Sequence, residues 1–152
     1  MTTRICHSKG IVSFDEREEK AIVPYEKKAN KFISAPANAR RLHPIVEDRL
    51  VALEKYANET PLNRIEWNDK KIGIVTSGVA YTYAKEVFGD TASYLKIGFS
   101  YPLPMDKIKA FADEVDTLYV VEELEPFMEE QMKAHGIACT GKELIPNIGE
   151  LN

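Results

Sequence analysis

Short apolar runs alternate with helix-length segments between residues 71 and 140, and this rhythm restricts the possible folds more than any other feature of the chain. Three runs rich in β-branched and aromatic residues predict strands buried on both faces, at 71–76, 93–99 and 117–121. Helices are predicted after them at 79–88, 106–114 and 127–135, and a short last strand at 137–140. Strands that alternate with helices form crossover units, so the sequence predicts an α/β fold with a mostly parallel sheet.

The first part of the chain has a different character. Residues 1–40 show no apolar period, and the alternating charges at 15–20 predict a solvated arm or linker rather than part of a core. An apolar stripe at helical spacing follows: Val46, Leu50, Leu53 and Ala57. Pro44 suits the first turn of a helix, so a helix is predicted to begin there. We therefore expect an arm over residues 1–40 and an α/β domain over residues 41–152.

The charge balance restricts the partners of the chain. A net charge of −4 and a pI near 5.5 argue against nucleic acid and against an anionic membrane surface, which both attract basic proteins. No apolar run approaches the roughly 20 residues of a membrane-spanning helix. The first residues lack an apolar stretch of signal-peptide length, which favours a cytoplasmic protein.

Cysteine and histidine do not form a recognisable metal or catalytic pattern. The two cysteines, Cys6 and Cys139, lie near opposite ends of the chain, whereas zinc or an iron–sulfur cluster usually needs four ligands. Both are predicted to be buried or unreactive thiols. His7 and His43 have no partner that the sequence assigns, so surface or interface positions are expected for them.

Three loops are predicted to follow the parallel strands at one edge of the sheet, at 77–81, 100–104 and 122–126. The sequence predicts a docking edge formed by four residues of these loops: Ser77, Gly78, Tyr101 and Glu123. A tyrosine beside prolines is a stiff amphipathic anchor, and a carboxylate can pair with a basic group of a partner. The alternative is that these loops face water.

Two motifs in these loops could be read as active sites. Gly73 and Gly78 have the spacing of phosphate-binding P-loop glycines, but Val79 and Ala80 replace the lysine and hydroxyl residue of that motif. A tight strand-to-helix turn explains Gly78 better. The acidic run at 122–125 is predicted to cap a helix and contact a partner rather than to catalyse a reaction. No residue is predicted to be catalytic, to bind a cofactor or to bind a metal.

Several strings in this chain resemble a known family when they are taken in order. They are TTRICHSKGIV, SAPANARRLHP, KIGIVTSGVAYTYAKEVF, LKIGFSYPLP, LYVVEELEPFMEEQ and GKELIPNIGEL. In this order and spacing they resemble the middle of the alpha subunit of indolepyruvate ferredoxin oxidoreductases, with the densest match at 71–151. The resemblance implies an internal piece of a longer subunit, so Met1 is expected not to be its natural start.

The resemblance implies a fold and a parent reaction. The fold is that of the transketolase C-terminal domain, a three-layer α/β/α arrangement around a mostly parallel five-stranded sheet. Residues 1–40 would leave a preceding pyrimidine-binding domain. The parent enzyme would oxidatively decarboxylate an aryl 2-oxoacid such as indolepyruvate to an acyl-CoA and reduce ferredoxin, using thiamine diphosphate, magnesium and [4Fe–4S] clusters.

The partners implied are the rest of the alpha subunit, a beta subunit, ferredoxin and coenzyme A. In the family, the thiamine-activating glutamate precedes this stretch, and the diphosphate–magnesium motif and the cluster cysteines follow it. The chain alone is therefore expected to be inactive. Two alternatives stay open at this point. One is a free-standing small-ligand or protein-interaction α/β module, and the other is the same domain of a pyruvate or 2-oxoglutarate enzyme.

Overall fold

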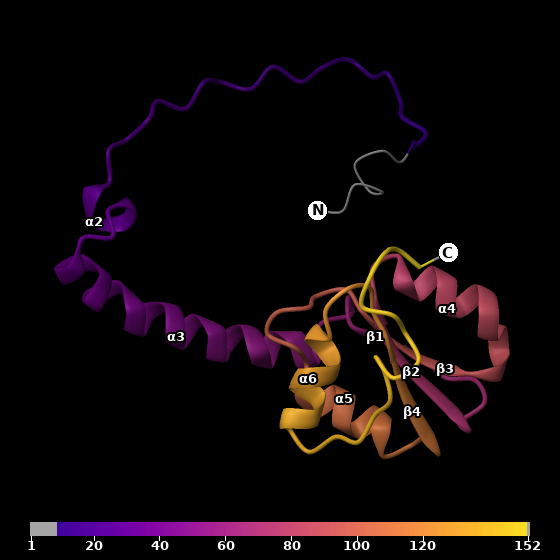
Figure 1. Ribbon diagram of the computed structural model, residues 1–152. Coiled ribbons are helices and arrows are strands. Elements are labelled where there is room, and N and C mark those ends of the chain that lie inside the picture. Colours follow the sequence, from indigo (N-terminus) through magenta and orange to yellow (C-terminus); the bar gives the residue numbers. More distant parts are fainter. Residues whose placement is uncertain (1–8, 152) are drawn as a thin grey trace.

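A computed structural model describes residues 9–151, and Cys6 and His7 lie outside the described residues. The elements in chain order are α2 (Ala29–Phe32), α3 (Pro36–Glu59), β1 (Arg64–Glu66), β2 (Ile72–Ser77), α4 (Ala80–Phe88), η1 (Gly89–Thr91), β3 (Ser93–Ile97), α5 (Met105–Ala112), β4 (Thr117–Val121) and α6 (Phe127–Ala134). Figure 1 shows two regions: an extension, residues 9–59, and a body, residues 60–151, that contains the sheet.

The body confirms the predicted α/β class. Four strands form one sheet in the order β1-β3-β2-β4, in which β2 pairs in parallel with both β3 and β4. β1 is antiparallel to β3 and lies at one edge. Next to β4, Thr140 forms a single parallel bridge with Tyr119, within residues 137–140, where the last strand was expected.

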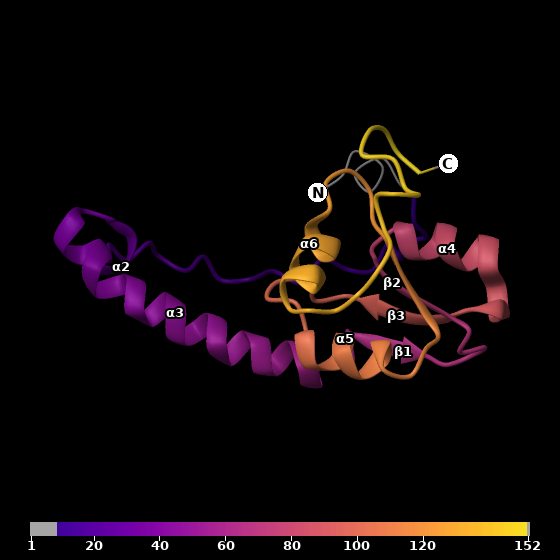
Figure 2. The same cartoon turned by 60° about the horizontal axis from the view of Figure 1, so that its bottom comes forward.

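The sheet lies between two layers. One face packs on α5 and α6 through a core that includes Val75, Leu95 and Val120. The opposite face packs on α4 through Ile74 and Tyr94. Figure 2 shows α4 and α5 on opposite sides of the strands. Both faces of the central strands are buried, which is why their sequences are continuous apolar runs rather than alternating ones.

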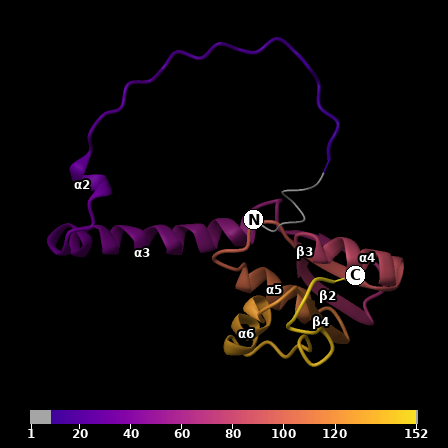
Figure 3. The ribbon, with the colours of Figure 1, turned by 45° about the horizontal axis from the view of Figure 1, so that its top comes forward.

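Helix α3 corrects the prediction about Pro44. The helix begins at Pro36, so Pro44 lies inside it and the helix crosses residue 40, where the arm was expected to end. Proline removes one backbone hydrogen bond from a helix interior. Pro44 and Arg40 are exposed, so water can bind the carbonyl that proline leaves without its usual donor. Most of α3 projects from the body, as Figure 3 shows.

Candidate functional site

The three predicted loops do meet at the edge where β2, β3 and β4 end. A pocket of about 280 Å³ lies there, lined by Ser77, Gly78, Val79, Ala80, Ser100, Glu122, Glu123, Glu125, Phe127 and Met128. Ser77, Gly78 and Glu123 of the proposed docking edge thus line one pocket. Tyr101 stands beside it, since its ring centroid is 6.5 Å from that of Phe127, which lines the pocket. Their role in docking stays a prediction.

An apolar patch that was not predicted from the sequence lies beside this pocket. Tyr101 is 60% exposed, Leu124 54% and Phe127 44%, and we call these three residues the edge patch. Leu124 has a φ of 57°, a left-handed conformation that is costly for a residue with a large side chain. The one sequence feature that could have indicated an exposed Leu124 is its place between two glutamates in a short loop before a proline.

Gly78 forms the turn from β2 into α4. Its φ of 54° explains why glycine occupies this position, as the strand-to-helix turn predicted. The residue that precedes α4 is Val79, and it offers no side-chain cap to the helix. Neither Val79 nor Ala80 can supply the charge or hydroxyl that a diphosphate and its magnesium would need, so these residues do not fit that cofactor.

Glu122 caps α6, as was predicted for this acidic run. Its carboxylate accepts the backbone N–H groups of Met128 at 2.8 Å and Glu129 at 3.0 Å. Burial raises the pKa of the Glu122 carboxyl group, because the charged form loses water. Since its oxygens are already engaged with the start of the helix, Glu122 is better suited to holding α6 than to transferring protons.

The segment after Thr140 is tied to the same region. Glu123 accepts the backbone N–H of Leu151 at 3.1 Å. Buried Glu129 accepts the N–H of Lys142 at 2.8 Å, and the Lys142 ammonium donates to the carbonyl oxygen of Glu122 at 2.6 Å. These contacts join residues that are far apart in the sequence, so its pattern could not predict them.

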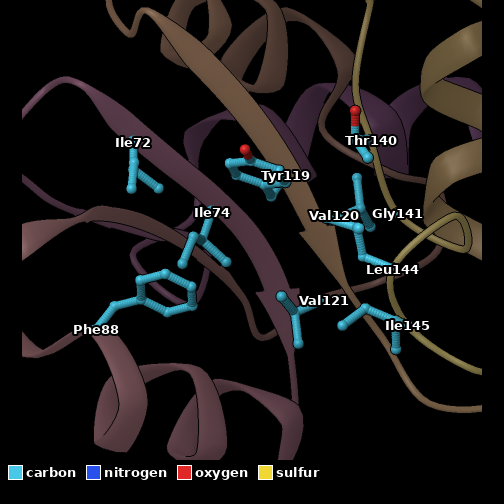
Figure 4. Close-up of a pocket in the computed structure, with 10 residues that line it drawn as sticks. All are labelled: Ile72, Ile74, Phe88, Tyr119, Val120, Val121, Thr140, Gly141, Leu144 and Ile145. Atoms are coloured by element: carbon cyan, nitrogen blue, oxygen red, sulfur yellow. The ribbon is translucent and has the colours of Figure 1, made fainter.

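A second cavity lies over the α4 face of the sheet. It measures about 220 Å³ and is lined by Ile72, Ile74, Phe88, Tyr119, Val120, Val121, Thr140, Gly141, Leu144 and Ile145. Figure 4 shows Phe88 on one side and Ile145 on the other, with Ile74 and Val121 of the sheet between them. No charged side chain lines this cavity, so it offers apolar contact without a group that could activate a substrate.

The remaining titratable candidates have structural partners. His43 lies exposed on α3, and its Nε2 is 2.8 Å from the Glu47 carboxylate. Cys139 is a half-buried free thiol, and burial raises its pKa. Within residues 9–151, no group of three or more His, Cys, Asp or Glu side chains is arranged to hold a metal. Among the described helices, none is long and apolar enough to cross a membrane.

Comparison with known proteins finds relatives that match nearly the whole chain. No family model matches the chain. Indolepyruvate oxidoreductase subunit IorA of Thermococcus kodakarensis is 32% identical over 99% of this chain and 26% of that subunit. IorA of Archaeoglobus fulgidus is 33% identical over 90% of the chain and 23% of its own length. The chain is similar to part of the IorA subunits.

This confirms the resemblance found in the sequence strings. The IorA of Methanothermobacter thermautotrophicus agrees, at 34% identity over 88% of the chain and 22% of that protein. The chain therefore spans about a quarter of the length of the IorA subunits that it matches.

A solved structure has a similar fold. It is a 2-oxoglutarate:ferredoxin oxidoreductase from Magnetococcus marinus with 2-oxoglutarate, coenzyme A and succinyl-CoA bound. The match has a TM-score of 0.51 and 14% identity, and covers 70% of this chain and 20% of that one. At this identity the match concerns the fold alone.

Proposed function

We propose that this chain is a structural and docking domain of a longer thiamine-dependent 2-oxoacid:ferredoxin oxidoreductase. The observation that carries the proposal is the match of IorA subunits to 88–99% of the chain. The parent reaction would be the oxidative decarboxylation of an aryl 2-oxoacid, such as indolepyruvate, to an acyl-CoA with reduction of ferredoxin. Its setting would be the cytoplasm, and its partners the rest of the subunit and a second, beta subunit.

The cofactors of this enzyme would be bound outside the chain. Thiamine diphosphate, when bound, stabilises the carbanion formed on decarboxylation, and [4Fe–4S] clusters carry the electrons. A [4Fe–4S] cluster takes four thiolates, whereas the sequence has only Cys6 and Cys139. The strand-end pocket has Val79 and Ala80 where a diphosphate site needs polar groups.

Within the parent enzyme, the docking edge of Ser77, Gly78, Tyr101 and Glu123 would contact a neighbouring domain or subunit. The rigid loops that present it support this role. Glu122 fixes α6 behind the edge through two backbone N–H groups, and Glu123 is held by the backbone of Leu151. Tyr101 adds an exposed aromatic side chain beside that of Phe127, and aromatic residues are enriched among the energetically important positions of interfaces. The division into an arm, residues 1–40, and a domain, residues 41–152, is part of the same proposal.

The docking role is tested in the full-length subunit with Tyr101→Ala and Glu123→Gln together. Glutamine keeps the acceptor for Leu151 and removes only the charge. We expect weaker subunit association and slower 2-oxoacid-dependent ferredoxin reduction. Glu130→Gln, an exposed position on α6 outside the pocket, is the matched control. Unchanged assembly and turnover would contradict docking, and lost turnover with intact assembly would reopen a catalytic role for Glu123, which the single Glu123→Gln variant would then test.

Calorimetry tests the absence of a cofactor site. We expect no heat of binding when the 152-residue chain is titrated with thiamine diphosphate and magnesium. Micromolar binding would show that the chain holds part of the active site. If the chain is a free-standing binding module instead, the 152 residues alone should bind a specific ligand.

A further inference from the structure

Two exposed surfaces of this chain have opposite charge, and each of them exposes large apolar side chains. The first is the edge patch of Tyr101, Leu124 and Phe127, beside the carboxylates of Glu123 and Glu125 that line the pocket. The second is the segment around α2. It carries three lysines against one glutamate in residues 26–33, and it exposes Phe32 at 63% and Ile33 at 53%. We call residues 26–33 the basic segment.

The basic segment cannot reach the edge patch of its own chain. Asn38 of α3 donates to the carbonyl oxygens of Asn30 at 2.9 Å and Ile33 at 2.6 Å, and Arg41 donates to that of Asn30 at 2.7 Å. The basic segment is therefore fixed to the start of α3. Because α3 has 24 residues, its length of about 36 Å separates this segment from the body. Figures 1 and 3 both show α2 at the far end of α3.

Helix α3 leaves the body right beside the edge patch. The Tyr56 ring near its end lies edge-on to Phe99, with centroids 5.5 Å apart, and Phe99 is two residues before Tyr101. The buried Asn63 side chain fixes this joint. Its amide nitrogen donates to the carbonyl oxygens of Ala57 and Phe99, and its oxygen accepts the N–H groups of Gly98 and Phe99. The direction of α3 relative to the patch is thus set by the fold.

We propose that a second copy of this chain occupies the docking edge, with the two α3 helices antiparallel and each basic segment seated on the partner's edge patch. Helix α3 ends beside the patch and holds the basic segment at its other end, one helix length away. When two copies are related by a two-fold axis with their α3 helices antiparallel, each basic segment therefore reaches the partner's patch. The proposal rests on the docking role above and names the occupant.

The chemistry of the two surfaces supports this pairing. Lys27, Lys28 and Lys31 would face the glutamates of the partner's pocket, with Phe32 on the partner's aromatic side chains. Lys28 would give up its ion pair with Glu26 to reach the partner. That pair is exposed to water, so breaking it costs little free energy. Between the two ends, α3 exposes Ile45 at 47% and Val46 at 42%, and these side chains would be covered by the partner's α3.

The first test is the mass of the 152-residue chain in solution. Sedimentation velocity between about 1 and 100 µM, the range of weak specific interfaces, is expected to show a monomer–dimer equilibrium. Raising the salt from low to about 1 M should weaken the dimer at least tenfold, because the pairing depends on exposed charges. A chain that stays monomeric over this whole range at low salt overturns the proposal.

Charge reversal then tests the reciprocal geometry. Lys27→Glu/Lys28→Glu/Lys31→Glu and, separately, Glu125→Lys are each expected to weaken the dimer at least tenfold. An equimolar mixture of the two variants should recover it. In that heterodimer one contact is wild type on both sides, and the other has both charges reversed. Glu130→Lys, close by on α6 but outside the pocket, should leave the dimer unchanged.

A third variant removes an apolar contact without threatening the fold. Leu124→Gly suits the backbone, since a φ of 57° is favourable for glycine, and it deletes an exposed side chain of the edge patch. We expect an unchanged or higher melting temperature together with a dimer weakened about fivefold or more. A dimer that survives all three variants, or a mixture that does not recover it, overturns the proposal.

These outcomes are separable from those of the proposed function. Self-association is measured on the chain alone, whereas docking is measured by assembly of the full-length subunit. If the chain is monomeric but Tyr101→Ala/Glu123→Gln still disrupts assembly, the docking role stands and the occupant is not a second copy. If self-association follows the charge pattern but assembly is unaffected, the edge joins copies of this domain and the assembly role is wrong.

Discussion

The extension and the body are built from sequences of similar apolar content, yet only one of them buries its side chains. Among residues 9–59, Ala57 is the only buried residue, while Ile22, Val23 and Phe14 are almost fully exposed. The body buries the central strands on both faces. An apolar period therefore predicts a helix but not what the helix packs against, because burial depends on a partner surface.

The two regions also use asparagine differently. Asn38 in the extension and Asn63 in the body both hold backbone carbonyls, but Asn38 does so in water and Asn63 with 1% of its surface exposed. A buried polar group whose partner is removed costs its full desolvation free energy, whereas an exposed one forms a hydrogen bond to water instead. Equal hydrogen bonds therefore contribute unequally to stability.

The largest expected difference between the regions is in amide hydrogen exchange. Residues 9–28 should exchange at nearly unprotected rates, while strand β4 should be protected by a factor of about 10⁴ or more, because its amides open only with the whole body. Hydrogen exchange measured by mass spectrometry on dilute, monomeric chain checks this. Equal protection in the two segments would show that the extension is an integral part of the core.

Asn63→Ala tests whether the Asn63 hydrogen bonds fix α3 to the body. The change leaves four backbone groups at the joint without a side-chain partner, so we expect a loss of about 2–4 kcal/mol in the free energy of unfolding. Asn38→Ala is the matched control and should change it by less than about 0.5 kcal/mol. Urea denaturation measures both. A stable Asn63→Ala protein would mean that α3 is not fixed to the body.

Gly73 in the body and Gly10 in the extension differ in the same way in how tightly they are packed. A methyl group on Gly73 would lie 2.7 Å from a Val115 methyl carbon and 3.1 Å from the Phe111 ring, whereas one on Gly10 would meet no atom of residues 9–151 within 4 Å. Gly73→Ala should therefore destabilise the body by about 1–3 kcal/mol through overpacking. Gly10→Ala should have no measurable effect. If thermal unfolding shows the two variants to be equally stable, β2 is not packed against α5 as described.

The smallest effect concerns acid stability. The hydrogen bond from Tyr81, with those from Lys85 and Arg64, lowers the pKa of Glu66 from 4.5 to about 2. Because the folded pKa is the lower one, this stabilisation is present above about pH 4.5 and is lost as the pH falls towards 2. Glu122 acts in the opposite sense. Burial raises its pKa, so its contribution favours the fold at acid pH and declines as the pH rises.

Glu66→Gln tests this dependence on pH. The variant should lose less of its thermal stability between pH 5 and pH 3 than the wild type, by an amount that solvent screening keeps modest. Glu47→Gln on the exposed part of α3 is the control, and its profile should follow that of the wild type. Parallel profiles for all three proteins would show that Glu66 does not stabilise the body.

The sequence predicted the parts of the fold that short segments decide. The three central strands, the helices after them and the glycine turn at Gly78 were found from apolar runs and turn residues. Strand β1 was missed, because Arg64–Glu66 has one apolar residue and is a strand only through its pairing with β3. The last strand predicted at 137–140 forms only the single bridge of Thr140, since the backbone N–H of Ile137 donates instead to Met132 of α6.

At the candidate site, the sequence alone determined which residues follow the strands, and crossover topology then required Ser77, Gly78 and Glu123 to meet at one edge. The acidic run was predicted to cap a helix, but the folded structure was needed to show that Glu122 is the capping residue, that Leu124 adopts a left-handed conformation, and that α3 stands apart from the core. The physical reason is one of range. Turn residues and apolar periods act over a few neighbours, whereas burial and the contacts of Glu123 and Glu129 with the C-terminal segment depend on groups that are distant in the chain and become neighbours only when it folds.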